Sequence, residues 1–135
     1  MISRDLIINT QKQMEMIDIT SQLEKQIHGS GITSGLCLIF NPHTTAGLTI
    51  NEGADPAVKV DIINGLEKIV PMSFPFKHLE GNSPAHIMAS LIGCSLTLLI
   101  EDQRFILGTW QKIFFCEFDG PRRRTVKWRI FGDKT

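Results

Sequence analysis

Two histidines lie close together in residues 76–90, FKHLEGNSPAHIMAS, where a glycine turn precedes a predicted helix. Ser83 is expected to cap this helix, and Pro84 suits its first position, where an N–H would have no partner. His86 then falls in the first turn, where the positive end of the helix dipole disfavours an imidazolium. His86 is therefore expected to stay neutral and to act as a metal ligand or a hydrogen-bond acceptor.

Further polar residues precede this helix. His78 and Glu80 stand just before Gly81 and Asn82, and a turn at the glycine would bring them toward the helix start. The free N–H groups of a helix N-terminus form an anion-binding site. Another histidine, His43, belongs to a separate motif, NPHTTAGLTINE.

The three histidines predict one shared site. Zinc binds imidazole nitrogens and, with three protein ligands, leaves a fourth position to water or substrate. His43, His78 and His86 could form such a set, with zinc or magnesium as the divalent metal. In a metal-free alternative, the same histidines and backbone N–H groups hold phosphate. In the simplest alternative, each histidine only satisfies its own turn.

Polar residues also follow the predicted strand 47–51. Asp55 is expected to be a helix cap. Asn51 could orient a histidine or a substrate amide, and Glu52 is either a partner of a site residue or a surface carboxylate.

The motif GTWQ supplies Trp110 and Gln111 after an apolar strand. Trp110 offers a flat surface on which a pyrimidine ring could stack, or it is an aromatic residue of the core or of a subunit interface. Further on, strand alternation would send Arg122 and Arg124 to one side. Arg122 is interpreted as a phosphate ligand or as a salt bridge between subunits.

Composition limits the class of protein. The 135 residues are 42% hydrophobic, which is enough for one core, so residues 1–135 are expected to form a single domain. Fourteen basic residues balance fourteen acidic ones, which argues against a nucleic-acid or membrane partner. The three cysteines lie in apolar runs and are expected to be reduced core residues. No long apolar segment or signal peptide is recognised, so a cytoplasmic location is expected.

Strand-like and helix-like segments alternate without a linker. A hairpin is expected between the first two strands, and a capping box of Ser21 and Glu24 for the first helix. Strands that dominate both ends favour an α+β fold with antiparallel sheets. Strands are predicted at residues 2–9, 14–19, 35–40, 47–51, 95–100, 104–107, 112–118 and 125–131, and helices at 21–27, 56–70 and 84–92.

Three ordered motifs carry a resemblance to a known family. The strings PHTTAGLTINEGADP, HLEGNSPAHIMASLIG and LGTWQKIFFCEFDGPRRR resemble those of the YjbQ family, the secondary thiamine-phosphate synthase-like proteins. The likeness covers about residues 35–130. Two departures are Lys112, where glycine is expected, and Cys94, where proline is expected.

The resemblance implies an antiparallel β-sandwich flanked by helices, a homotrimer and a histidine-lined site. It also implies a weak or secondary thiamine-phosphate synthase, which joins an aminopyrimidine-methyl diphosphate to a thiazole phosphate and releases diphosphate. The alternative is a protein that binds a phosphorylated metabolite or a metal without turnover. The aromatic residues of the C-terminal strands agree with an oligomer, because they offer more apolar surface than a small sandwich hides; they are Trp110, Phe114, Phe115 and Phe118.

The motifs and the resemblance together assign a role to each candidate residue. Catalysis is assigned to His78, His86, Glu52 and Arg122, and metal binding to His43, His78 and His86. Substrate binding is assigned to Asn51, Glu80, Gly81, Asn82, Ser83, Trp110 and Gln111.

Overall fold

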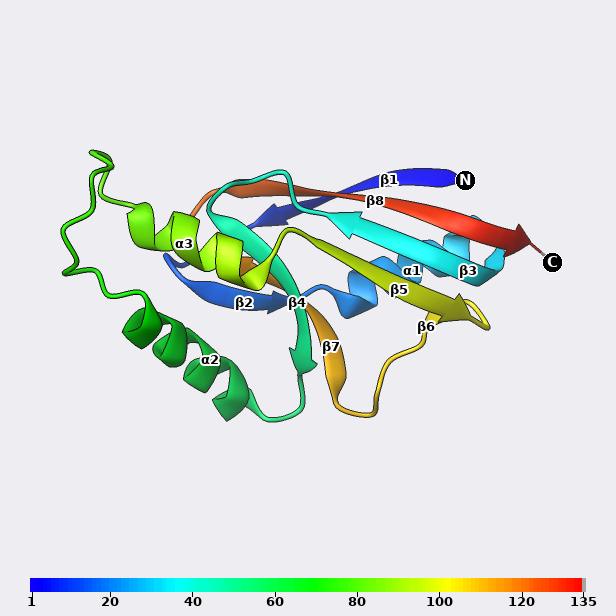
Figure 1. The fold of residues 1–135 in the computed structure, drawn as a ribbon. Coiled ribbons are helices and arrows are strands. Elements are labelled where there is room, and N and C mark those ends of the chain that lie inside the picture. The colour runs from blue at the N-terminus through cyan, green and yellow to red at the C-terminus, as the bar shows by residue number, and fades with distance from the viewer. Residues whose placement is uncertain (135) are drawn as a thin grey trace.

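The computed structural model describes residues 1–134, which fold into two antiparallel sheets and three helices (Figure 1). The predicted α+β class is confirmed. The strands are β1 (Ile2–Asn9), β2 (Glu15–Asp18), β3 (Ile32–Phe40), β4 (Ala46–Glu52), β5 (Ser95–Glu101), β6 (Arg104–Phe105), β7 (Gln111–Glu117) and β8 (Arg123–Lys134), and the helices are α1 (Thr20–Ser30), α2 (Pro56–Ile69) and α3 (Ser83–Ile92).

The two sheets divide the strands unequally. One has the order β1-β8-β3-β5-β6, and the other has the order β2-β7-β4. The predicted hairpin between the first two strands is wrong, because β1 pairs with β8 and β2 pairs with β7. Other hydrogen bonds hold the segment between β1 and β2. Glu15 Oε2 accepts hydrogen bonds from the N–H groups of Gln11 and Lys12, and Thr10 N donates a hydrogen bond to Arg122 O.

Two apolar cores result from this arrangement. The larger core lies between the sheets and includes Trp128, Phe115 and residues of α1. The smaller one lies between the three-stranded sheet and the helices α2 and α3, and contains Phe114 and Phe118. The expected excess of exposed aromatic surface on the C-terminal strands is therefore wrong for three of its four residues, and only Trp110 is exposed, at 62%.

Part of the exposed apolar surface lies on the outer face of the five-stranded sheet. Leu36 of β3 stands opposite Leu99 of β5 and Phe131 of β8, so the three side chains share one face. Each is more than 40% exposed, as is Leu38. We call Leu36, Leu38, Leu99 and Phe131 the outer-sheet patch.

The helix starts follow local capping chemistry only in part. Asp55 caps α2 as predicted, and its Oδ1 accepts a hydrogen bond from Ala57 N at 2.9 Å. The N-cap of α3 is Asn82, one residue before the predicted Ser83. The capping box predicted for α1 is wrong, because the helix starts at Thr20, whose N–H donates to Asp18 Oδ1.

The cysteines differ from one another. Cys37 and Cys116 are buried as expected, and burial raises the pKa of each thiol to about 12. Cys94 is exposed, contrary to the expectation, because it follows Gly93 in the connection between α3 and β5.

None of the helices within residues 1–134 has the length and apolar character that a bilayer crossing requires.

Candidate functional site

His78 and His86 lie side by side at the start of α3. Their ring centroids are 5.3 Å apart in an edge-to-face arrangement. Gly81, with φ of +77°, provides the turn that brings the exposed His78 back toward the helix. Both rings line one pocket together with Lys77 and Ser83. This pocket combines a cationic side chain, two imidazoles and a helix N-terminus, so it suits an anion. We call it the α3 pocket.

His43 approaches His86 from the β3–β4 connection. The buried Asn41 shapes this connection: its Nδ2 donates to Ala46 O at 2.7 Å, and its Oδ1 accepts from His43 N at 3.0 Å. His43 and His86 line a second pocket, in which Cys94 also lies. The three histidines are therefore brought together in pairs, His43 with His86 and His86 with His78.

The ring of His43 is held against the start of β8. In the tautomer that carries its proton on Nδ1, Nε2 accepts a hydrogen bond from Thr125 N at 3.0 Å. Burial lowers the pKa of His43, and the neighbouring positive charge of Arg124 lowers it further. Both effects favour the neutral imidazole.

A metal held by all three histidines does not fit this geometry. Across residues 1–134 no three His, Cys, Asp or Glu side chains form a group that could hold a metal ion. The Nε2 atom of His43 already has a backbone partner. The residues as placed fit the phosphate alternative better than the three-histidine zinc or magnesium site.

A second set of predicted residues lies at the far end of β4. Asn51 and Glu52 end that strand, whereas His43 precedes its start, and a strand of this length spans about 20 Å. Glu52 and Trp110 line a separate pocket with Asp55, and Gly53 N donates to Trp110 O. The structure therefore does not bring these residues to the histidines within one chain.

The remaining predicted residues there make local contacts. Asn51 Oδ1 accepts a hydrogen bond from the N–H of Glu52 at 2.7 Å, and Gln111 Oε1 accepts one from Gly108 N at 2.7 Å. Glu80, near the α3 pocket, is exposed and does not line that pocket.

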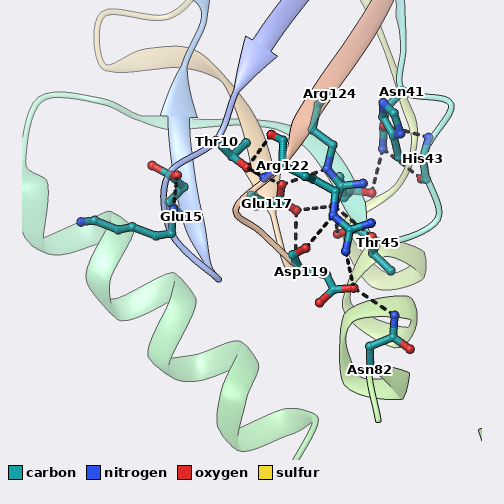
Figure 2. A network of polar contacts seen from close by, with 12 residues as sticks. Thr10, Glu15, Asn41, His43, Thr45, Asn82, Glu117, Asp119, Arg122 and Arg124 are labelled. Carbon is teal, nitrogen blue, oxygen red and sulfur yellow. Dashed lines mark hydrogen bonds and ion pairs between the residues drawn. The ribbon is translucent and has the colours of Figure 1, made fainter. Parts of the chain in front are cut away.

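Arg122 does not point freely into a pocket. Its Nε donates to Asp119 O at 2.8 Å, and its Nη2 donates to Asp119 Oδ2 at 3.0 Å. The same Oδ2 accepts a hydrogen bond from Nδ2 of Asn82, the N-cap of α3, at 2.9 Å (Figure 2). Arg122 therefore supports the helix start through Asp119. Besides burial, the positive charges of Arg124 and Arg122 both lower the pKa of His43, which agrees with the expectation that the two side chains lie on one side.

Arg124 forms a buried ion pair with Glu117, and neither residue is among the predicted site residues. Their side chains are 3% and 0% exposed. Arg124 Nε donates to Glu117 Oε1 at 2.9 Å, and Arg124 Nη2 also donates to Glu117 Oε2 and to Thr45 Oγ1. Thr10 Oγ1 donates to Glu117 Oε1 at 2.7 Å (Figure 2). Through Thr45, this network holds the β3–β4 connection two residues after His43.

Burial alone would raise the pKa of the Glu117 carboxyl. The hydrogen bonds from Arg124, Thr10 and Asp119 N outweigh burial, and the pKa is lowered. A signal for this pair was present in the sequence, because Arg124 continues the inward alternation of Val126, Trp128 and Ile130.

Comparisons with known proteins identify the family of this chain. The sequence model of the family described as UPF0047 protein YjbQ-like matches residues 4–133. The UPF0047 protein MJ1081 of Methanocaldococcus jannaschii is 55% identical over 94% of this chain and 92% of its own length. The UPF0047 protein YugU of Bacillus subtilis is 49% identical over 96% of this chain and 98% of its own length.

Solved structures of related proteins have a similar fold. A YjbQ/UPF0047-family protein from Clostridium acetobutylicum has a TM-score of 0.92 and 48% identity, over 95% of this chain and 99% of that one. The hypothetical protein APE1520 from Aeropyrum pernix has a TM-score of 0.93 and 33% identity, over 98% of this chain and 100% of that one. The chain belongs to the YjbQ-like UPF0047 family.

Proposed function

We propose that this protein binds a phosphorylated small molecule in the α3 pocket. The observation that carries the proposal is the placement of His78 and His86, with rings 5.3 Å apart, beside Lys77 at the start of a helix. A phosphate group would accept hydrogen bonds from the two imidazoles and from Ser83, and the charge of Lys77 would complement it.

The reaction we propose is a weak thiamine-phosphate synthesis, which the family resemblance implies. The bond between the pyrimidine methylene carbon and the diphosphate oxygen breaks, and the electron pair leaves with diphosphate. The lone pair of the thiazole nitrogen then forms the new carbon–nitrogen bond. The α3 pocket supports this proposal because its hydrogen-bond donors and the charge of Lys77 would stabilise the negative charge that a leaving diphosphate gains.

Two other assigned roles change in this proposal. Arg122 acts through Asp119 and Asn82 and positions the helix start, so it is a positioning residue. Glu52 and Trp110 lie too far from His86 within one chain to act on the same phosphate, and they would take part only if another subunit brought them there.

Calorimetric titration with inorganic diphosphate tests the binding proposal. We expect the His78→Ala and His86→Ala variants to weaken diphosphate binding by on the order of tenfold each, because each substitution removes a donor to an anion. His28→Ala is the matched control, since His28 is exposed at the end of α1, outside the α3 pocket. Equal affinity in all three variants and the native protein would exclude phosphate binding by the two histidines.

A further inference from the structure

A separate cavity of about 240 Å³ lies between α2, α3 and the segment after β7. Its apolar walls include three methionines, Met14, Met72 and Met88, together with Phe118. A dry cavity of about 150 Å³ is large enough to admit benzene. This cavity can therefore hold a small ring or a short apolar chain, which methionine side chains accommodate well because they are flexible and polarisable.

The charged groups at the cavity are acidic. Glu67 of α2 and Asp119 line it, whereas the lysines, arginines and histidines of residues 1–134 do not. Asp119 is already oriented: its Oδ2 accepts hydrogen bonds from Asn82 Nδ2 at 2.9 Å and from Arg122 Nη2 at 3.0 Å (Figure 2). Within the described chain its Oδ1 accepts no hydrogen bond, and Glu67 forms no ion pair.

These carboxylates favour a ligand that donates hydrogen bonds. Arg122 neutralises part of the charge of Asp119, and the charge of Glu67 remains. An ammonium or amino group would donate hydrogen bonds to Asp119 Oδ1. An ammonium group would also place its positive charge near Glu67. An anion would meet two carboxylates instead.

We propose that this cavity binds the amine-bearing end of a small ligand, with the apolar body of the ligand on Met14, Met72, Met88 and Phe118. A neighbouring pocket shares Met72, Gly81 and Pro84 with the cavity and also contains His78 and Ser83 of the α3 pocket. One ligand with an amine at one end and a phosphate at the other would span both. This inference rests on the proposed function for the phosphate end only.

Methionine-methyl NMR tests the amine site directly. The protein has five methionines, and three of them line the cavity, so Met1 and Met16 serve as internal controls. Benzylamine is the probe, and benzyl alcohol is the matched compound without a positive charge. We expect benzylamine to shift the three cavity methyl signals and to bind on the order of tenfold more tightly than benzyl alcohol.

Charge-removing variants complete the test. Asp119→Asn and Glu67→Gln are each expected to weaken benzylamine binding, with a larger effect for Asp119→Asn on the order of tenfold. Asp61→Asn is the control, because Asp61 is exposed on α2 and does not line the cavity. If Asp119→Asn lowers the midpoint of thermal unfolding, the Glu67→Gln variant tests the amine site in its place, since that exposed side chain forms no ion pair within residues 1–134.

Benzylamine that binds no better than benzyl alcohol, or that keeps its affinity in Glu67→Gln and Asp119→Asn, overturns the amine site. A diphosphate titration of the same samples separates this result from the proposed function. Failure of diphosphate to bind, with benzylamine binding intact, contradicts the phosphate pocket and supports the amine site. Diphosphate binding without benzylamine binding contradicts the amine site and supports the phosphate pocket.

Discussion

Arg124 and Glu117 form a buried ion pair that joins the start of β8 to the end of β7. The carboxylate of Glu117 also accepts hydrogen bonds from the neighbouring Asp119 N and from Thr10 Oγ1, which is distant in sequence. Arg124 reaches Thr45 in the β3–β4 connection, close to His43. The position of His43 therefore depends on a charge network in the interior.

Breaking this ion pair should destabilise the protein strongly. Glu117→Gln leaves the Arg124 guanidinium buried without its counter-charge, and we expect a loss of about 3–5 kcal/mol in the free energy of unfolding. Denaturant unfolding followed by circular dichroism measures it. The control is Asp5→Asn, which breaks the half-exposed ion pair with Lys127 and should cost less than about 1 kcal/mol. Equal losses in both variants would contradict a structural role for the buried pair.

The lowered pKa of Glu117 gives the stability a defined pH dependence. In the folded state the pKa lies below its ordinary value of 4.5, so the unfolded state binds the proton more readily. The contribution of Glu117 to stability is therefore present above pH 4.5 and is lost as the pH falls through the folded-state pKa. Unfolding free energies measured from pH 7 down to pH 3 should show this loss in the native protein. A Glu117→Gln variant with the same slope below pH 4.5 would show that other groups cause it.

The local features of the fold could be predicted from sequence because their causes are local. Asp55 followed by Pro56 fixes the start of α2 through one side chain and one restricted φ angle. The strands were placed by apolar runs, and the antiparallel α+β class follows from their order. The pairing of β1 with β8, across most of the chain, has no local signal, and the expected hairpin was wrong for that reason.

The candidate site could be predicted in part for similar reasons. His78 and His86 are eight positions apart around a glycine turn, and the structure places their rings together. The Arg124–Glu117 pair depends on how two sheets meet, and only the alternation of β8 hints that Arg124 points inward. His43, before the start of β4, and Glu52, at its end, belong to one sequence motif but are separated by the extended strand.

The outer-sheet patch should mediate self-association, and we predict a homotrimer. Four apolar side chains on one face are each more than 40% exposed in the single chain, which is typical of an interface. Sedimentation equilibrium at micromolar concentration should give three times the chain mass of 15.2 kDa. Leu99→Lys should shift the protein toward the monomer. Val60→Lys, on an exposed position of α2, is the control and should leave the assembly unchanged.

A native protein that sediments as a monomer would exclude this assembly. A trimer that survives Leu99→Lys would place the interface on another face.

Thiamine-phosphate synthesis should be measurable and should not require a metal held by the three histidines. Purified protein with both phosphorylated substrates should form thiamine phosphate and diphosphate in equal amounts. His86→Ala should lower kcat/KM by on the order of ten- to a thousandfold if its contact with the leaving diphosphate strengthens in the transition state. Since His43, His78 and His86 form no metal-binding group, pretreatment with a chelator should leave diphosphate binding unchanged. Product formation at the uncatalysed rate would reject the synthase, and loss of diphosphate binding after chelation would reject a metal-free phosphate pocket.

The α3 pocket is tested most directly by mapping where diphosphate binds in solution. Backbone and imidazole NMR signals are followed while inorganic diphosphate is added to the native protein. We expect the largest shifts at Lys77, His78, Ser83 and His86, and none at Trp110 or Glu52, which lie at the far end of β4. Shifts that gather at Trp110 and Glu52, or no saturable shifts at the start of α3, would contradict phosphate binding by this pocket.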